Sequence, residues 1–255
     1  MKLVMLGSGT STGVPRIGND WGECDPKEPR NRRTRVSIMV ESNEGSRLLV
    51  DTSTDLRQQL LANDIEKVDG VFWTHDHADH CHGIDDLRPM RFSRNAPLPG
   101  FASAETARSL RQRFGYVFAG RYGYPTIVQL ETLDVVKIHA GFAVGSVEMP
   151  HGPTSSTGYR FDADGKSIAY ATDFSEVTDA MLALFDGIDI LVTDCLRREP
   201  HPTHASLAMA LDMARQCGAQ TTVLTHLDKS MDYATLSSEL PPGVVVGYDG
   251  MVLVA

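Results

Sequence analysis

The sequence predicts an α/β (α+β) fold in which two mixed β-sheets pack face to face and helices cover their outer faces, an αββα sandwich. Strand-like apolar runs occur in two series, and helix-like segments close each series. The 255 residues contain no low-complexity tract and no linker rich in Pro, Ser or charge. We therefore expect a single domain over residues 1–255.

The first series of strands begins at the N-terminus, with a strand over Leu3–Leu6. Alternation in residues 36–40 and the apolar run 48–50 predict a hairpin that turns at residues 43–45. Residues 51–55 end this hairpin and cap a helix, whose buried face should hold Leu56, Leu60 and Leu61. The remaining elements of this half are a strand over 68–73, a helix near 83–92, a strand over 97–102 and a helix over 104–114.

The second series is longer and ends with alternating helices and strands. We expect strands over 126–130, 135–139, 143–149, 156–161 and 167–171. A helix over 175–185, a strand over 188–193, a helix over 204–216 and a strand over 221–224 should follow. Residues 244–246 and 251–254 are expected to form a final strand pair.

Composition excludes several classes of protein. No segment approaches the ~18 uninterrupted apolar residues of a membrane span, and residues 1–7 lack the pattern of a secretory signal, so we expect a cytoplasmic protein without a membrane partner. The four cysteines are scattered without a CxxC pair, which argues against a disulfide framework. A net charge of −9 disfavours passive binding to a nucleic-acid backbone.

Two loop-like segments remain after the elements are assigned. The glycine-rich residues 7–15 fit a tight turn better than an anion-binding nest, because their spacing matches no phosphate-binding fingerprint. Residues 16–35 predict an irregular surface loop, with arginines at 30, 32, 33 and 35 that are solvated rather than in contact with an anionic substrate. The aromatic segment 114–124 fits a flap beside the active site, and its role is left open.

The chemistry concentrates in Thr74-His75-Asp76-His77-Ala78-Asp79-His80, directly after an apolar strand. Three imidazoles and two carboxylates in seven residues require a positive charge among them. Three later strands also end in a metal-binding side chain, namely His151, Asp173 and His226. Five of the nine histidines occupy these strand ends. Imidazole and carboxylate donors without thiolates favour a catalytic site for zinc, manganese or iron over a closed structural zinc site.

With its downstream partners, the His75–His80 motif resembles the metallo-β-lactamase superfamily and covers its five ligand-bearing motifs in order. Residues 6–10, Thr193-Asp194-Cys195, His204 and residues 246–251 look most like the phosphoribosyl cyclic phosphodiesterases. Transfer RNA 3′-processing endonucleases share the first half of the pattern. The resemblance runs nearly end to end and implies the αββα metallo-β-lactamase sandwich.

The resemblance also implies two divalent metal ions. One would be bound by His75, His77 and His151, the second by Asp79, His80 and His226, and Asp173 would bridge them, with a hydroxide between the metals. Zinc or manganese is expected, and iron is compatible. Asp79 and His204 are expected to be catalytic, and His204 would protonate the leaving oxygen or hold a phosphoryl oxygen. A helix N-cap or a surface position is the alternative for His204.

The chain departs from these relatives at a separate structural zinc site. Only Cys24 stands where they carry several cysteines, and Lys229 stands where they carry a further histidine. The sequence therefore predicts no structural zinc. The phosphoribosyl cyclic phosphodiesterases act in phosphonate breakdown, and this departure favours membership of a wider group of related phosphoesterases over a role in that pathway.

Other polar residues near the motif are expected in supporting roles. Asp76 should orient a ligand or the nucleophile, and Asp51 and Asp249 should hydrogen-bond to ligand histidines. His82 is expected to orient a neighbour or be solvated, and His139 to be structural. His201 is expected to be a loop histidine rather than a substrate contact.

Three functions compete for this site. We expect a phosphodiesterase that uses the bridging hydroxide to hydrolyse a small cyclic or nucleotide-like phosphodiester, without a stable nucleic-acid partner. An RNA 3′-processing endonuclease would need a positive docking arm, for which the sequence offers no support. A thioester or lactone hydrolase could use the same ligands. The resemblance also allows a homodimer.

Overall fold

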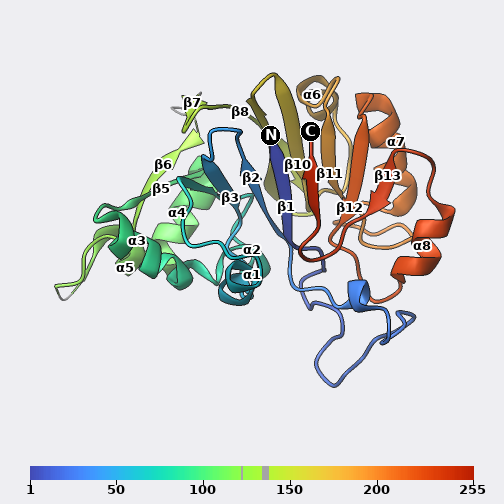
Figure 1. Cartoon of the computed structure of the whole chain (residues 1–255), viewed down its shortest axis with the longest axis horizontal. Coiled ribbons are helices and arrows are strands. Elements are labelled where there is room, and N and C mark those ends of the chain that lie inside the picture. The colour runs from blue at the N-terminus through green and yellow to red at the C-terminus, as the bar shows by residue number, and fades with distance from the viewer. Residues whose placement is uncertain (122, 134–137) are drawn as a thin grey trace.

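The computed structural model describes residues 1–121, 123–133 and 138–255. In this part of the chain, two seven-stranded sheets pack face to face, and helices cover both outer faces (Figure 1). The predicted αββα sandwich is confirmed. Among the described helices, none has the length and apolar character needed to cross a membrane.

The first sheet has the strand order β14-β1-β2-β3-β4-β5-β6. The hairpin predicted around residues 43–45 is formed by β2 and β3, with Ile38 opposite Val50. From β3 to β6 the strands are parallel, so their carboxyl ends lie at one edge of the sheet. The strands are β1 (Lys2–Gly7), β2 (Ser37–Glu41), β3 (Arg47–Val50), β4 (Gly70–Phe72), β5 (Leu98–Ala102), β6 (Val128–Thr132) and β14 (Val252–Val254).

The second sheet repeats this design in the order β13-β12-β11-β10-β9-β8-β7. Its strands β7 to β10 pair antiparallel and β10 to β13 pair parallel. The strands are β7 (Ile138–His139), β8 (Phe142–His151), β9 (Thr154–Ala163), β10 (Lys166–Ala171), β11 (Ile190–Asp194), β12 (Thr221–Thr225) and β13 (Val244–Val246). Residues 135–137 of the strand predicted over 135–139 lie outside the described residues.

Side chains alternate between the inside and the outside of the sandwich. Leu48 and Val50 belong to the core between the sheets, together with Phe72 and Tyr159, whereas Leu49 faces the helices. The core between the sheets draws residues from both sheets and contains a cluster of aromatic rings. This core brings the strand ends of the two sheets close together.

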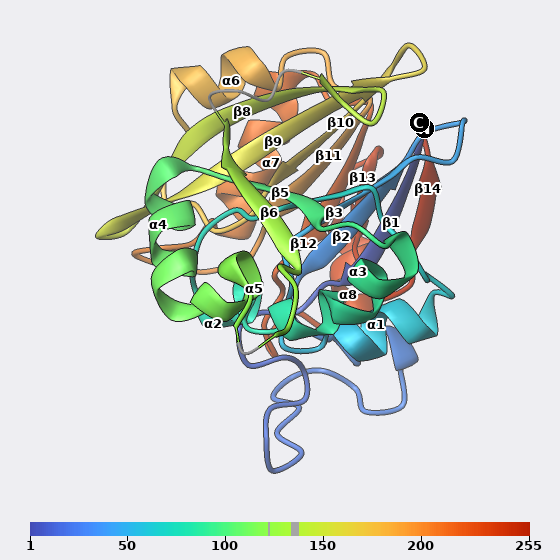
Figure 2. The same ribbon diagram turned by 90° about the vertical axis from the view of Figure 1, so that its left-hand side faces the viewer.

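Helices from the first half of the chain pack on the first sheet, and those from the second half pack on the second sheet (Figure 2). The first set is α1 (Leu56–Ala62), α2 (Ala78–Cys81), the 3₁₀ helix η2 (Ile84–Leu87), α3 (Arg88–Arg94), α4 (Ala104–Arg113) and α5 (Gly115–Ala119). The second set is α6 (Asp179–Leu184), α7 (Leu207–Cys217) and α8 (Tyr233–Glu239). The 3₁₀ helix η1 (Pro29–Asn31) instead lies against α8, where Asn31 contacts Asp232 and Tyr233. The predicted flap segment thus contains α5, and its residue 122 lies outside the described residues.

The final two strands do not pair with each other, contrary to the sequence prediction. β13 joins β12 in the second sheet, while β14 pairs antiparallel with β1 in the first. The chain crosses between the sheets at Gly247, where a Cβ atom would lie 2.6 Å from the Leu224 carbonyl oxygen. Each apolar strand therefore completes the edge of a different sheet.

Three helix predictions also need correction. Leu61 is 62% exposed, and the buried position on α1 belongs to Gln59, whose Nε2 donates to the Arg35 carbonyl oxygen at 2.7 Å. α7 begins at Leu207 and is capped by the Ser206 hydroxyl, so His204 precedes the helix and is not its N-cap. The helix predicted from residue 175 begins only at Asp179, after the Thr178 cap.

Candidate metal centre

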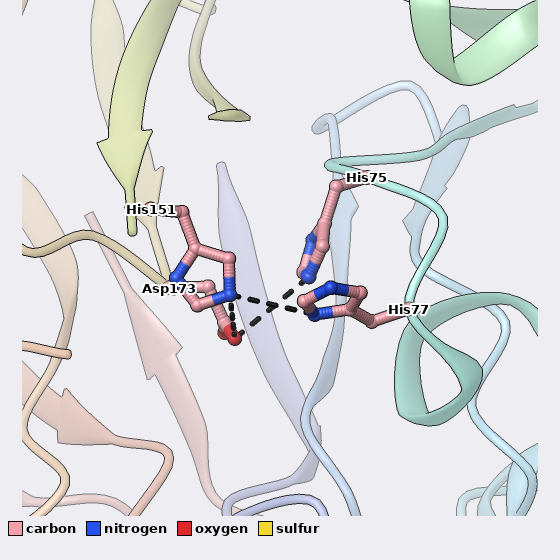
Figure 3. A group of neighbouring side chains, drawn as sticks. All are labelled: His75, His77, His151 and Asp173. Atoms are coloured by element: carbon pink, nitrogen blue, oxygen red, sulfur yellow. Dashed lines mark hydrogen bonds and ion pairs between the residues drawn. The ribbon is translucent and has the colours of Figure 1, made fainter. Parts of the chain in front are cut away.

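The seven predicted metal ligands meet where strands from both sheets end. The turn after β4 and the short helix α2 supply four of them, and β8, β10 and β12 each supply one at or just after their last residue. Figure 3 shows side chains from the two sides pointing toward one another. The seven residues are His75, His77, Asp79, His80, His151, Asp173 and His226.

The first ligand group contains His75, His77, His151 and Asp173 (Figure 3). Asp173 Oδ2 lies 3.8 Å from His75 Nε2 and 3.6 Å from His151 Nε2. His151 Nε2 is 3.4 Å from His77 Nδ1. His75, His151 and Asp173 are buried while His77 is exposed, so this group has one side open to solvent.

The second group contains Asp79, His80 and His226, and it uses the other oxygen of Asp173. Asp173 Oδ1 lies 3.3 Å from His80 Nε2 and 3.6 Å from His226 Nε2. Asp79 Oδ2 is 3.4 Å and 3.7 Å from the same two nitrogens. The carboxylate of Asp173 therefore presents one oxygen to each group.

These residues fit a pair of metal ions. The Nε2 atoms of His75, His80 and His226 are buried and have no hydrogen-bond partner among the described residues. Four ligands at ~2.1 Å in a tetrahedron are separated by about 3.4 Å, close to the ligand-to-ligand distances in both groups. Buried polar atoms without partners are costly, so their convergence at this spacing matches a cation site.

The carboxylates control the protonation of the surrounding histidines. Burial opposes the charged form of His226, but the carboxylates of Asp173 and Asp79 raise its pKa to about 9. Burial also opposes the charged form of Asp173, yet His226 and His80 hold the pKa of its carboxyl well below its usual range. Burial and the charge of His80 lower the pKa of His75. The carboxylates of the centre therefore stay ionised, and their negative charge favours binding of a cation.

Hydrogen bonds behind the ligands orient their rings. His80 Nδ1 donates to Asp51 Oδ2 at 2.7 Å, and Asp51 is fully buried and also accepts from the Thr74 hydroxyl at 2.9 Å. His151 Nδ1 donates to the Thr203 carbonyl oxygen at 2.7 Å. In both histidines this arrangement leaves Nε2 for the metal position. Asp51 makes the contact expected from the sequence.

Asp194, which the sequence interpretation named only within a family-like segment and gave no role, also lies at this centre, in a group with Asp173, His204 and His226. This buried carboxylate accepts from His204 Nδ1 at 3.0 Å and lies 3.7 Å from His226 Nδ1. The ring of His204 stacks on His226 with centroids 4.7 Å apart, which places it beside the second ligand group. Asp194 ends β11, so the strand-end rule that identified Asp173 could also have found it.

Other sequence expectations are corrected by their contacts. Among the described residues, the Asp76 carboxylate accepts a hydrogen bond from Ser109 and pairs with Arg113 of α4, and it makes no hydrogen bond or ion pair with a predicted metal ligand. Asp249 bonds the backbone and hydroxyl groups of Ser8 and Thr34 instead of a histidine.

The remaining histidines lie outside the two ligand groups. His82 is exposed and contacts Arg113. His139 contacts the Asp69 carbonyl oxygen at 3.0 Å and packs on Phe101, which fits its expected structural role. His201 Nδ1 accepts from the Thr203 amide in its own loop, and its ring centroid lies 5.2 Å from that of His204.

A second buried polar cluster forms around Arg33, which the sequence interpretation placed on a solvated surface. Arg33 is only 2% exposed. Its guanidinium donates to the carbonyl oxygens of Met231 at 2.6 Å and Asp228 at 3.2 Å, and to Asn31 Oδ1 at 3.3 Å. Cys24 Sγ lies 3.9 Å from the same group. We call these five residues the Arg33 cluster.

The family model of the beta-lactamase superfamily domain matches residues 46–227, which include both metal-ligand groups. The chain belongs to the metallo-β-lactamase superfamily. It is a hydrolase of that fold, in agreement with the two packed sheets and the histidine and aspartate groups.

Similar proteins carry several different names. A crystal structure of a new diphosphatase from the PhnP family is 38% identical, with a TM-score of 0.87, over 99% of this chain and 96% of that one. A Porphyromonas gingivalis octanoyltransferase is 34% identical over 98% of this chain, but the chain spans only 51% of that protein. Ribonuclease Z from Halobacterium salinarum is 25% identical over 89% of this chain and 91% of its own length.

Proposed function

We propose that this chain is a dinuclear metal-dependent phosphodiesterase that hydrolyses a small cyclic or nucleotide-like phosphodiester. The observation that carries the proposal is the position of Asp173, which presents one carboxylate oxygen to each of two ligand groups. A carboxylate that faces two ligand groups in this way suits a pair of closely spaced divalent ions. The donor set suits zinc or manganese, and iron is also compatible.

Each ligand group would hold one cation. His75, His77 and His151 would hold the first, Asp79, His80 and His226 the second, and Asp173 would contact both. When bound, the two cations would activate a water for attack at phosphorus and screen the charge that develops on the phosphoryl oxygens. Asp51 and Thr203 would keep His80 and His151 in the required orientation.

His204 would supply the proton for the leaving oxygen. Its Nδ1 is held by Asp194 at 3.0 Å, which leaves Nε2 as the nitrogen that can contact a substrate atom. The Asp194 carboxylate thus fixes the orientation of the His204 ring. Asp79 would act in the same step only by holding the second cation next to the phosphoryl group.

The similarity to a diphosphatase and a ribonuclease supports chemistry at phosphorus, because both names denote cleavage of a bond to phosphorus. A small substrate is favoured over RNA because the chain carries a net charge of −9, which opposes sequence-independent binding to a nucleic-acid backbone. A small diester needs only the local positive charge of the metal centre.

A second candidate is hydrolysis of an acyl thioester. It is favoured by the 34% identity to an octanoyltransferase, although the aligned part is about half of that protein. The same activated water could attack a carbonyl carbon.

The purified protein should contain about two metal ions per chain by plasma mass spectrometry. It should cleave bis(p-nitrophenyl) phosphate well above an octanoyl thioester and a lactone. The reverse ranking would favour the acyl candidate, and efficient processing of precursor transfer RNA at low enzyme concentration would favour a nuclease.

Three histidine variants test the assignment of residues. His77→Ala should remove most of the metal and the activity, whereas His204→Ala should lower turnover about 10²-fold or more with the metal content unchanged. His82→Gln is the matched control, because His82 lies in the same segment but outside both ligand groups. Full metal retention in His77→Ala, or metal loss in His204→Ala, would contradict the assigned roles.

A further inference from the structure

His77 is the ligand of the first group with the least support behind its ring. The ring of His151 is held by the Thr203 carbonyl oxygen, and His75 Nδ1 contacts the Thr74 hydroxyl at 3.0 Å. Among the described residues, the His77 ring has one contact within hydrogen-bond distance, to Nε2 of His151 at 3.4 Å (Figure 3). His77 is also exposed, and the chain directly before it is an irregular loop. The position of this ring therefore depends on the backbone that carries it.

That backbone is contacted from α4. The guanidinium of Arg113, the last residue of α4, donates to the main-chain carbonyl oxygen of Asp76, which directly precedes His77. The same group pairs with the Asp76 carboxylate at 3.3 Å, and this carboxylate also accepts from the Ser109 hydroxyl. Arg113 further donates to Nε2 of His82, beyond the last ligand of the turn, and His82→Gln keeps an acceptor there. One guanidinium thus spans the turn that carries the ligands.

The helix α4 is suited to hold this contact in place. It is capped by the Ser103 hydroxyl, and Ala107 and Leu110 pack in the core beside the first sheet. Ser109 and Arg113 are four residues apart, so they lie on one face of the helix. Side chains on a packed helix give a loop a more rigid support than side chains on another loop.

The charge of Arg113 by itself opposes a cation at the metal centre. The Asp76 carboxylate offsets this charge, and water screens it, because the two side chains are 34% and 36% exposed. If Arg113 acted through its charge, its removal would strengthen metal binding. If it acts by holding the loop, its removal weakens metal binding. The two roles therefore predict effects of opposite sign.

We propose that Arg113 is a positioning residue for the first metal ion, because it holds Asp76 and thereby orients His77. This inference rests on the metal ions of the proposed function but not on the reaction itself. The effect is confined to the first ligand group, since His80 of the second group lies on α2 and is held by Asp51.

Stepwise competition for zinc with a chromogenic chelator tests the proposal. Arg113→Ala should weaken one of the two zinc ions about tenfold and leave the other unchanged. Arg113→Lys keeps the charge but loses the planar fork, so it should weaken the same ion about threefold, and it tests the proposal also if Arg113→Ala folds poorly. Arg108→Ala is the matched control, because Arg108 is an exposed arginine of α4 outside the hydrogen bonds to Asp76.

A double variant identifies the ion concerned. Asp51 holds His80 of the second group, so Asp51→Asn should weaken the other zinc ion. Arg113→Ala combined with Asp51→Asn should therefore show two weakened ions, each by the factor found in the single variant. One tight ion left in the double variant would overturn the proposal, because both changes would then act on the same site.

Unchanged or tighter zinc binding in Arg113→Ala would also overturn the proposal. Equal weakening of both ions would do the same, because it would indicate a merely structural role. If the unmodified protein binds two zinc ions but does not cleave bis(p-nitrophenyl) phosphate, the phosphodiesterase function fails and the role of Arg113 stands. Absence of bound zinc from the unmodified protein would reject both.

Discussion

Two buried polar clusters in this protein satisfy their need for positive charge in opposite ways. The metal centre gathers carboxylates and imidazoles, and the buried Nε2 atoms of His75, His80 and His226 have no hydrogen-bond partner among the described residues. The Arg33 cluster gathers carbonyl oxygens and an amide around a guanidinium that belongs to the chain itself. The first cluster is suited to cations from solution, whereas the second carries its own.

Because of this difference, the metal centre is accessible to other molecules, whereas the Arg33 cluster holds parts of the chain together. A cation taken from solution can contact water and substrate, and one side of the metal centre is open at His77. A guanidinium enclosed by carbonyl oxygens has no such access, but it ties residues 24–33 to residues 228–231 across about 200 positions of sequence. The first cluster therefore suits chemistry, and the second fixes a long loop against the second sheet.

Chelation should give the largest contrast between the clusters. After dialysis against a chelator, hydrolysis of bis(p-nitrophenyl) phosphate should fall to background, and zinc or manganese should restore it. Amide exchange measured by mass spectrometry should rise in residues 75–80 but stay unchanged in residues 24–33, because Arg33 remains in place. Equal loss of protection in both segments would contradict the comparison.

Removal of the Arg33 guanidinium should affect the stability of the protein but not its metal content. Arg33→Met leaves buried carbonyl oxygens without donors and should lower the free energy of unfolding by about 3–5 kcal/mol. Arg32→Met is the control, since Arg32 is exposed over the Trp21 ring and should change stability by only ~0.5 kcal/mol. Denaturant unfolding measures both. A large loss of bound metal in folded Arg33→Met would show that the clusters are coupled.

A smaller effect is expected from Asp51, which supports one side of the metal centre. Asp51→Asn weakens the hydrogen bond to His80 Nδ1 and should lower metal affinity about 10–100-fold at one of the two sites. Competition with a chromogenic chelator should show one tight and one weakened ion. Asp249→Asn, which changes a half-buried carboxylate outside the centre, should leave both affinities unchanged.

The smallest effect should come from Asp232, which borders the Arg33 cluster and caps α8. It accepts from Asn31 Nδ2 at 2.7 Å and from the Thr235 amide at 2.9 Å, and although burial opposes its charge, these hydrogen bonds lower its pKa to about 2. Because this pKa lies below the ordinary value of ~3.9, the stabilisation is present above pH 4 and is lost as the pH falls toward 2.

Asp232→Asn should therefore cost about 1 kcal/mol or less at pH 7, and the difference from the unmodified protein should vanish near pH 2. Denaturant unfolding at several pH values between 7 and 2 measures this difference. A constant difference over that range would show that the charge of Asp232 has no role.

Much of the fold and of the candidate site could be predicted because the signals are local. Alternating apolar residues identified most strands, and the polar residues just beyond them identified all seven members of the two ligand groups. Asp194 also stands at the end of a strand, but the sequence interpretation gave it no role at the centre. From the sequence alone, a carboxylate that binds a metal cannot be told from one that accepts a hydrogen bond from a histidine. Its role became visible only through its distance to His204.

The sequence by itself determined the two series of strands, the hairpins and the donors that stand at the strand ends, since each depends on residues close together in the chain. The tertiary structure alone decided which sheet receives each of the last two strands, whether Leu61 or Gln59 is buried, and that Arg33 is internal. These outcomes depend on partners far away in sequence, as in the contact of Arg33 with Met231. No local pattern encodes such a partner, because the packing of the two sheets creates it.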